Sequence, residues 1–420
     1  MSLSDDSGAL DYHRAREAAA AGATGVPVAP ALPPVRLVTA TAVILALAAA
    51  IYAVGAHGDP APQLQLSLIL GAAFGFVLQR SRFCFLCIWR DWLDRHDPRG
   101  LLGILTALAT GLVGYSLIYG AWLPDPAGAR LPPTAHIGPV GPALVLAGLA
   151  FGAGMAISGS CISAHLYRLG EGSPTSPFAL VGAGLGFWLG LLSWNELYLW
   201  SIADSPVLWL PRHLGYAGAL LVGLTVFAAL AYALLRSLPS NPIVSQPRLT
   251  PLAAIFHRRW PAWVGGLAVG LIGIAAYFRL SPLGVTAELA SRSRQAAASL
   301  DLLPSRLEGL DSFRGCATVI RDALLTPNGL FIAGLVAAAF AAALIAGEFR
   351  PRRPSTGQAL RGLIGGALLG WGTIVGLGCT VGTLLSGISA GAVSGWVFAL
   401  GLIIGTTATL KLGRRLGLLA

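Results

Sequence analysis

Long apolar runs separated by short polar loops make up most of the chain. A helical run of about 20 apolar residues crosses roughly 30 Å of hydrocarbon. Such runs lie at 37–56, 64–83, 101–122, 139–160, 177–199, 213–235, 262–280, 327–346, 361–382 and 391–412. Some of them are short and rich in glycine, as are half-helices that enter and leave on the same side. The pattern therefore predicts an all-α polytopic membrane protein of about nine or ten spans with interrupted helices.

The composition agrees with a membrane protein. Hydrophobic residues make up 55% of the 420 residues and charged residues only 11%, whereas soluble domains carry about 25% charged residues. The 54 glycines suit membrane helices, which associate through close backbone approach at small residues. Residues 1–36 lack the apolar core of a signal peptide, and we expect them to form a disordered tail.

The positions of arginine and lysine predict the orientation. If the spans alternate, the basic residues of the short loops fall on one side, and short basic loops face the cytoplasm. Both termini, a linker at 237–261 and a tail at 413–420 are then cytoplasmic. The loop at 281–326 would lie outside although it carries several arginines, but long loops are weak topology signals. The net charge of +10 reflects this orientation, and no nucleic-acid partner is needed to explain it.

One stretch of the first half recurs in the second half. The segments 148–166 and 366–384 align so that Cys161 falls on Cys379. The matched positions are Gly148, Gly152, Gly154, Cys161 and Leu166 with Gly366, Gly370, Gly372, Cys379 and Leu384. A glycine-rich composition alone is an alternative source of these identities, but the span count gives the two copies opposite directions. We therefore expect inverted repeats at 37–236 and 262–412, with a site near the midplane built by interrupted helices.

A third cysteine segment makes the sequence recognisable. The stretches "GFVLQRSRFCF", "GSCISAHLYRLGEGS" and "GLGCTVGTLLSG" resemble the three cysteine motifs of the YeeE/YedE family, bacterial sulfur-transport membrane proteins that take up thiosulfate or related sulfur species. The resemblance covers roughly 37–412. It implies an hourglass of inverted repeats in the bacterial inner membrane, with Cys84, Cys161 and Cys379 as pathway cysteines. It also implies a small soluble sulfurtransferase of the TusA type as a cytoplasmic partner.

Three features depart from the family pattern. Cys87 and Cys316 are additional to the motif cysteines, the loop at 281–326 is long, and the N-terminal tail matches no known segment. We expect Cys316, in the outer loop, to have little part in transport.

Thiols in series suit the passage of a sulfur anion. Thiosulfate is a dianion with a polarisable terminal sulfur, and a thiol is a weak donor that is cheap to bury. Such contacts favour entrance of the anion yet permit its departure, provided that the thiols stay protonated. Gly159, Ser160 and Gly378 beside the cysteines would let the backbone come close, and helix N-termini there could hold the charge.

Charged residues near the motifs are further candidates for the pathway. Arg80, Arg82 and Arg168 would draw the anion or balance its charge, with interfacial anchoring as the alternative. Glu171 belongs to the same motif as Arg168, and we expect the two to pair and fix a tight turn rather than to act as acid and base. His165, one helical turn after the second motif cysteine, is the first candidate for a proton carrier. Beyond Glu196 the predicted spans contain almost no carboxylate, which favours an anion path over a cation path.

Two other interpretations remain open. Cys84 and Cys87 form a C-x-x-C, which carries redox chemistry in thiol oxidoreductases, although no thioredoxin-like pattern surrounds it. Cys161 and His165 could begin a metal site, but two ligands do not complete one. We therefore expect a transporter rather than an enzyme, without metal or cofactor, and keep a membrane-bound thiol oxidoreductase as the alternative. Redox chemistry needs Cys87, whereas transport needs Cys161 and Cys379.

Overall fold

Ten long helices coincide with the ten predicted spans. The structure is a computed structural model that describes residues 34–56, 61–128, 130–238, 251–313, 315, 318, 323 and 325–419. The long helices are α2 (Pro34–Gly55), α3 (Ala61–Ser81), α5 (Arg99–Trp122), α6 (Pro142–Ser158), α8 (Ser176–Leu192), α10 (Leu210–Arg236), α12 (Ala262–Arg279), α14 (Pro327–Ile345), α15 (Thr356–Val375) and α17 (Val393–Arg415). In this part of the chain, 8 segments are long and apolar enough to cross a membrane, or up to 10 if each bent pair is one span.

Shorter helices follow or connect the long ones. They are α4 (Phe85–Arg95), α7 (Ile162–Gly170), α9 (Trp194–Leu197), η1 (Tyr198–Ile202), α11 (Pro251–Phe256), α13 (Ala287–Ser299), η2 (Leu310–Ser312), η3 (Thr380–Ser386) and α16 (Gly387–Ser389). The chain bends by 55° between α8 and the α9–η1 segment, and by 45° between α15 and the η3–α16 segment. The predicted interruptions of helices are therefore present.

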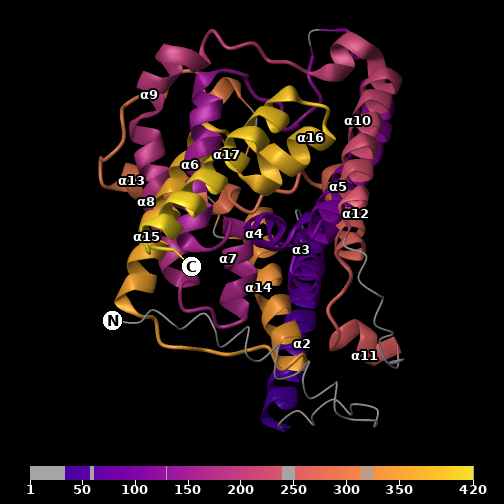
Figure 1. The fold of residues 1–420 in the computed structure, drawn as a ribbon, viewed down its shortest axis with the longest axis vertical. Helices are drawn as coiled ribbons and strands as arrows, with labels where there is room; N and C mark the ends of the chain where they lie inside the picture. Colours follow the sequence, from indigo (N-terminus) through magenta and orange to yellow (C-terminus); the bar gives the residue numbers. More distant parts are fainter. Residues whose placement is uncertain are drawn as a thin grey trace.

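The most extensive helix contacts all join the first half of the chain to the second half. Helix α15 packs on α8 and α6, α17 packs on α6, α14 packs on α3, and α12 packs on α5. Figure 1 shows α15, α8, α6 and α17 gathered on one side of the molecule and α10, α12 and α5 on the other. The two halves therefore interleave, and the core lies between them.

Glycines permit this interleaving. A Cβ atom added at Gly75 would overlap the carbonyl oxygen of Leu335, so α3 and α14 meet backbone to backbone. Gly154 lies against the backbone of Gly365, while Gly372 lies against that of Ala147, which shows that α6 and α15 run antiparallel. Small residues thus replace the hydrophobic force that lipid cannot supply between helices.

The segment predicted as a long outer loop packs on the bundle. It contains α13 and buries Leu283 and Val285. Ser293 donates through Oγ to the carbonyl oxygen of Gly184 in α8 at 2.7 Å. Cys316, most of the N-terminal tail and residues 239–250 of the linker lie outside the described residues.

Candidate functional site

The three motif cysteines occupy the same local position in the fold. Each stands at the N-cap of a short helix that follows a break in a longer one: Cys84 before α4, Cys161 before α7 and Cys379 before η3. Each break contains one residue in the left-handed region: Arg82 (φ 48), Gly159 (φ 89) and Leu377 (φ 56).

All three motif thiols are deeply buried. Cys84 is 0% exposed, and Cys161 and Cys379 are 1% exposed. The 17 residues of α6 and the 20 residues of α15 correspond to helices of about 25 and 30 Å. Because these helices are antiparallel and each break follows the helix C-terminus, Cys161 and Cys379 lie toward opposite ends of the helix pair. None of the four described cysteines forms a disulfide.

Hydroxyl groups surround the break before Cys161. The Cys161 Sγ lies 3.2 Å from the Ser163 Oγ. His165 is buried, and its Nδ1 and Nε2 lie 3.2 and 3.1 Å from the hydroxyls of Ser176 and Ser158. Both ring nitrogens are therefore occupied by serines. In the described part of the chain, no group of three His, Cys, Asp or Glu residues could hold a metal ion.

Two buried hydroxyls beside the cysteines lack partners. The Oγ of Ser160 and the Oγ1 of Thr380 have no hydrogen-bond partner, and both residues are 0% exposed. Buried hydroxyls are normally paired, so such groups require an explanation. A transient polar ligand beside Cys161 and Cys379 would satisfy them.

Gly159 and Gly378 meet different requirements. Gly159 needs its positive φ, and a Cβ atom there would meet nothing within 4 Å, so open space adjoins the break. Gly378 lacks a positive φ, but an added Cβ would lie 3.1 Å from the backbone nitrogen of Thr383. The nearest atom to that Cβ would be the Thr383 Oγ1 at 2.5 Å, so Gly378 makes room for the start of the helix that follows Cys379.

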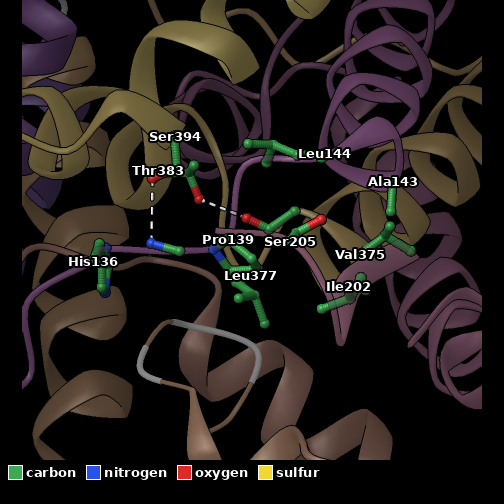
Figure 2. Close-up of a pocket in the computed structure, with 13 residues that line it drawn as sticks. His136, Pro139, Ala143, Leu144, Ile202, Ser205, Val375, Leu377, Thr383 and Ser394 are labelled. Carbon is green, nitrogen blue, oxygen red and sulfur yellow. Dashed lines mark hydrogen bonds between the residues drawn. The ribbon is translucent and has the colours of Figure 1, made fainter. Parts of the chain in front are cut away.

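A small cavity adjoins the break before Cys379. This His136 cavity holds about 20 Å³ and is lined by His136, Gly138, Leu377, Thr383 and Ser394, with Ser205 and further apolar residues. Figure 2 shows its two hydrogen bonds, from the backbone nitrogen of Gly138 to the Ser394 Oγ at 3.2 Å and from the Thr383 Oγ1 to the backbone oxygen of Gly376 at 3.0 Å. No sequence motif marks residues 136–141, so this cavity could not be predicted from local patterns.

A much larger cavity lies at the other end of the α6–α15 pair. This arginine cavity holds about 520 Å³. Its charged lining comprises six arginines, two glutamates and one histidine: Arg82, Arg168, Arg258, Arg259, Arg350, Arg352, Glu171, Glu348 and His257. Such an excess of positive charge attracts anions.

Glu348, which follows α14, connects α3 with the segment between α11 and α12 at the wall of the arginine cavity. Its carboxylate accepts from the Nη2 of Arg80 at 3.0 Å, from the Nε2 of Gln79 at 2.8 Å and from the Nε of Arg259 at 3.4 Å. Arg82, 43% exposed, lies 4.0 Å away. Burial opposes ionisation of Glu348, but Arg82, Arg259 and Arg80 outweigh this effect and lower its pKa.

Arg168 and Glu171 do not form the ion pair expected for this motif. Arg168 donates through Nη1 to the carbonyl oxygen of Gly159 at 3.2 Å and through Nη2 to the Sγ of Cys87 at 3.0 Å. Glu171 accepts from the Nε2 of Gln79 at 3.3 Å. Burial raises the pKa of Glu171, although Arg82 and Arg168 oppose this shift. Arg168 therefore stabilises the break at Gly159 instead of the turn.

A family model described as sulphur transport matches residues 80–408. The chain belongs to the sulphur-transport family. Two relatives are named thiosulfate transporter TsuA. The one from Escherichia coli (strain K12) is 28% identical over 75% of this chain and 84% of its own length. The one from Spirochaeta thermophila is 29% identical over 76% of this chain and 90% of its own length. A third, "Probable transporter YedE" of Escherichia coli (strain K12), is 27% identical over 40% of either chain.

The predicted site residues of this sulphur-transport protein fall into two groups. Arg82, Arg168 and Glu171 line the arginine cavity, whereas Cys379 and Gly378 adjoin the break beside the His136 cavity. Cys84, Cys161, Gly159, Ser160 and His165 lie at or next to the other two breaks. No motif points to Glu348, and Gln79 was given no role although it belongs to the first motif. Arg80, expected to draw the anion or balance its charge, is fully buried and pairs with Glu348 at 3.0 Å.

Proposed function

We propose that this sulphur-transport protein carries thiosulfate or a related sulfur-containing anion across the bacterial inner membrane, along a path that passes Cys379, Cys161 and Cys84. The observation that carries the proposal is the equivalent placement of the three thiols, each buried at the N-cap after a helix break. The printed names of the TsuA relatives support the choice of substrate.

The groups beside the thiols fit a dianion that has shed water. The unpaired hydroxyls of Ser160 and Thr380 would donate to the anion in the places where it contacts Cys161 and Cys379. A neutral thiol or hydroxyl binds weakly enough to release the anion to the next site. Arg82 and Arg168 would then attract it into the arginine cavity.

The arginine cavity faces the cytoplasm in this proposal, because short basic loops remain on that side. Both termini are then cytoplasmic, and the His136 cavity receives the anion from outside. Moving a dianion inward against 100 mV, inside negative, costs about 4.6 kcal/mol, at about 2.3 kcal/mol for each charge. A cytoplasmic sulfurtransferase of the TusA type would offset this cost by consuming the anion.

Uptake of radiolabelled thiosulfate by proteoliposomes that contain only the purified protein tests the proposal. We expect saturable uptake that increases when the interior is made positive and responds little to a pH gradient alone. Absence of uptake above protein-free liposomes would refute transport. Strong stimulation by an inward proton gradient at zero potential would contradict the uncoupled mechanism and make His165 the first proton carrier to examine. A thiol oxidoreductase would instead require Cys87 and tolerate loss of Cys161.

A further inference from the structure

Cys87 lies outside the proposed path, and its surroundings differ from those of the motif cysteines. It lies in the first turn of α4, and among the four described cysteines it alone is partly exposed. Its Sγ accepts a hydrogen bond from the Nη2 of Arg168 at 3.0 Å, and its thiol contacts that of Cys84. A guanidinium beside a cysteine sulfur favours the thiolate, which is the nucleophilic form.

The guanidinium of Arg168 is held between three parts of the site. It donates to the carbonyl oxygen of Gly159 at 3.2 Å as well as to Cys87, and it lines the arginine cavity. Next to Gly159, the buried hydroxyl of Ser160 has no hydrogen-bond partner. An oxyanion beside Arg168 would therefore find a fixed cation and a free hydroxyl near a nucleophilic sulfur.

We infer that Cys87 is a sulfur-accepting nucleophile that takes the outer sulfur atom of thiosulfate and becomes a persulfide. The inference rests on the proposed function, because transport brings thiosulfate to this part of the molecule. The Cys87 thiolate attacks the outer sulfur and forms a new S–S bond. The S–S bond of thiosulfate breaks, and its electron pair leaves with sulfite. Charge and atoms balance, and no oxidant or reductant is consumed.

The chemistry of the leaving group suits this site. Attack of a thiolate on an S–S bond is faster when the departing group is a weak base, as sulfite is compared with an alkyl thiolate. Arg168 would form charge-assisted hydrogen bonds to the departing sulfite, and these are stronger than neutral ones. Arg168 is therefore assigned two tasks: it favours the thiolate, and it stabilises the charge that develops on sulfite.

A soluble thiol would reach the persulfide from the arginine cavity past Arg168, which lines the cavity and contacts Cys87. The arginine cavity opens to solution, since Arg82 and Arg259 at its wall are 43% and 38% exposed. A thiolate that enters the cavity would attack the outer sulfur of the persulfide and regenerate the Cys87 thiolate. The excess of arginines at the wall selects an acceptor thiol that carries negative charge.

Labelling of the full-length protein in detergent tests this inference without a membrane gradient. The reduced protein is incubated with thiosulfate that is radiolabelled at the outer sulfur, then alkylated, and the label is mapped by peptide mass spectrometry. We expect one labelled sulfur on Cys87, release of sulfite in equal amount, and transfer of the label to glutathione, an anionic thiol. Cys87→Ser should lose the label.

Substitution of Arg168 tests its proposed roles beside Cys87. Arg168→Gln should slow labelling about tenfold or more and shift alkylation of Cys87 by iodoacetamide to higher pH. Arg95→Gln removes an arginine from the same helix at a distance from Cys87, and it should label at the wild-type rate with the wild-type alkylation profile. An unchanged profile in Arg168→Gln would overturn the role of Arg168.

Uptake measurements separate this inference from the proposed function. A wild-type protein that imports thiosulfate but carries no label, or carries it on another cysteine, overturns the persulfide and leaves transport intact. A wild-type protein that labels Cys87 but imports nothing retains the sulfur transfer and contradicts the transport function.

Discussion

Removal of Arg80 tests the ion-pair network most stringently, because Arg80 is a fully buried arginine. Its side chain is 0% exposed and donates to the Oε1 of Gln79 at 2.6 Å, to the carbonyl oxygen of Phe256 at 2.8 Å and to Glu348 at 3.0 Å. Breaking a buried pair typically costs about 3 to 5 kcal/mol, because the remaining charge is left uncompensated. Arg259 stays 3.4 Å from Glu348, so for Arg80→Met we expect the lower end, about 3 kcal/mol.

The Arg414–Asp94 pair provides the control. It is bidentate at 2.6 and 2.7 Å, but its side chains are 35% and 34% exposed, and exposed pairs contribute about 0.2 to 1 kcal/mol. Arg414→Met should therefore cost at most about 1 kcal/mol. The assay is the free energy of unfolding in mixed micelles by denaturant titration. Adding Glu348→Leu to Arg80→Met should recover part of the loss. Equal costs for the two arginines would refute this account of the network.

Three further stability changes follow from single positions, and each is measured in the same unfolding assay. Gly159→Ala should destabilise the protein by about 1 to 2 kcal/mol, the cost of a left-handed non-glycine residue. Gly184→Ala is the control and should not destabilise it, because an added Cβ at this helical position would meet nothing within 4 Å. Gly75→Ala should cost about 1 to 3 kcal/mol, because the Cβ overlaps the backbone of Leu335, and a cost equal to that of the control would contradict the backbone contact. Folding raises the pKa of Glu171 above its ordinary value of 4.5. Its contribution to folding stability is therefore fully present below pH 4.5 and is lost as the pH rises through the pKa of the folded state. The change in the free energy of unfolding caused by Glu171→Gln should therefore be more stabilising at neutral pH than at acidic pH. The opposite trend would contradict the burial of this carboxyl.

The spans could be predicted because lipid imposes a simple requirement of length and hydrophobicity. The breaks were only partly predictable. Gly159 is a residue type expected at a positive φ, but Arg82 and Leu377 adopt the left-handed region without such a signal. Tertiary packing therefore fixes two of the three breaks.

The ion-pair network could not be predicted from local patterns. Gln79 and Glu348 are 269 positions apart and meet only because α3 packs on α14. The same reason explains why Arg168 was expected to pair with the nearby Glu171, whereas it binds Cys87 from another helix. The segment at 281–326 was expected to be a loop because it is polar and rich in arginine, yet it buries Val285 against the bundle.

The most direct test of the central claim is the initial rate of thiosulfate uptake by proteoliposomes that contain Cys161→Ala or Cys379→Ala. A hydrogen bond to a charged group contributes about 1.5 to 3 kcal/mol, so loss of one thiol contact at a narrow site should slow uptake roughly 10- to 100-fold. We expect this loss in both variants at normal levels of folded protein, with partial recovery in the serine variants, which retain a donor. Wild-type rates in either alanine variant would contradict a path lined by the motif cysteines.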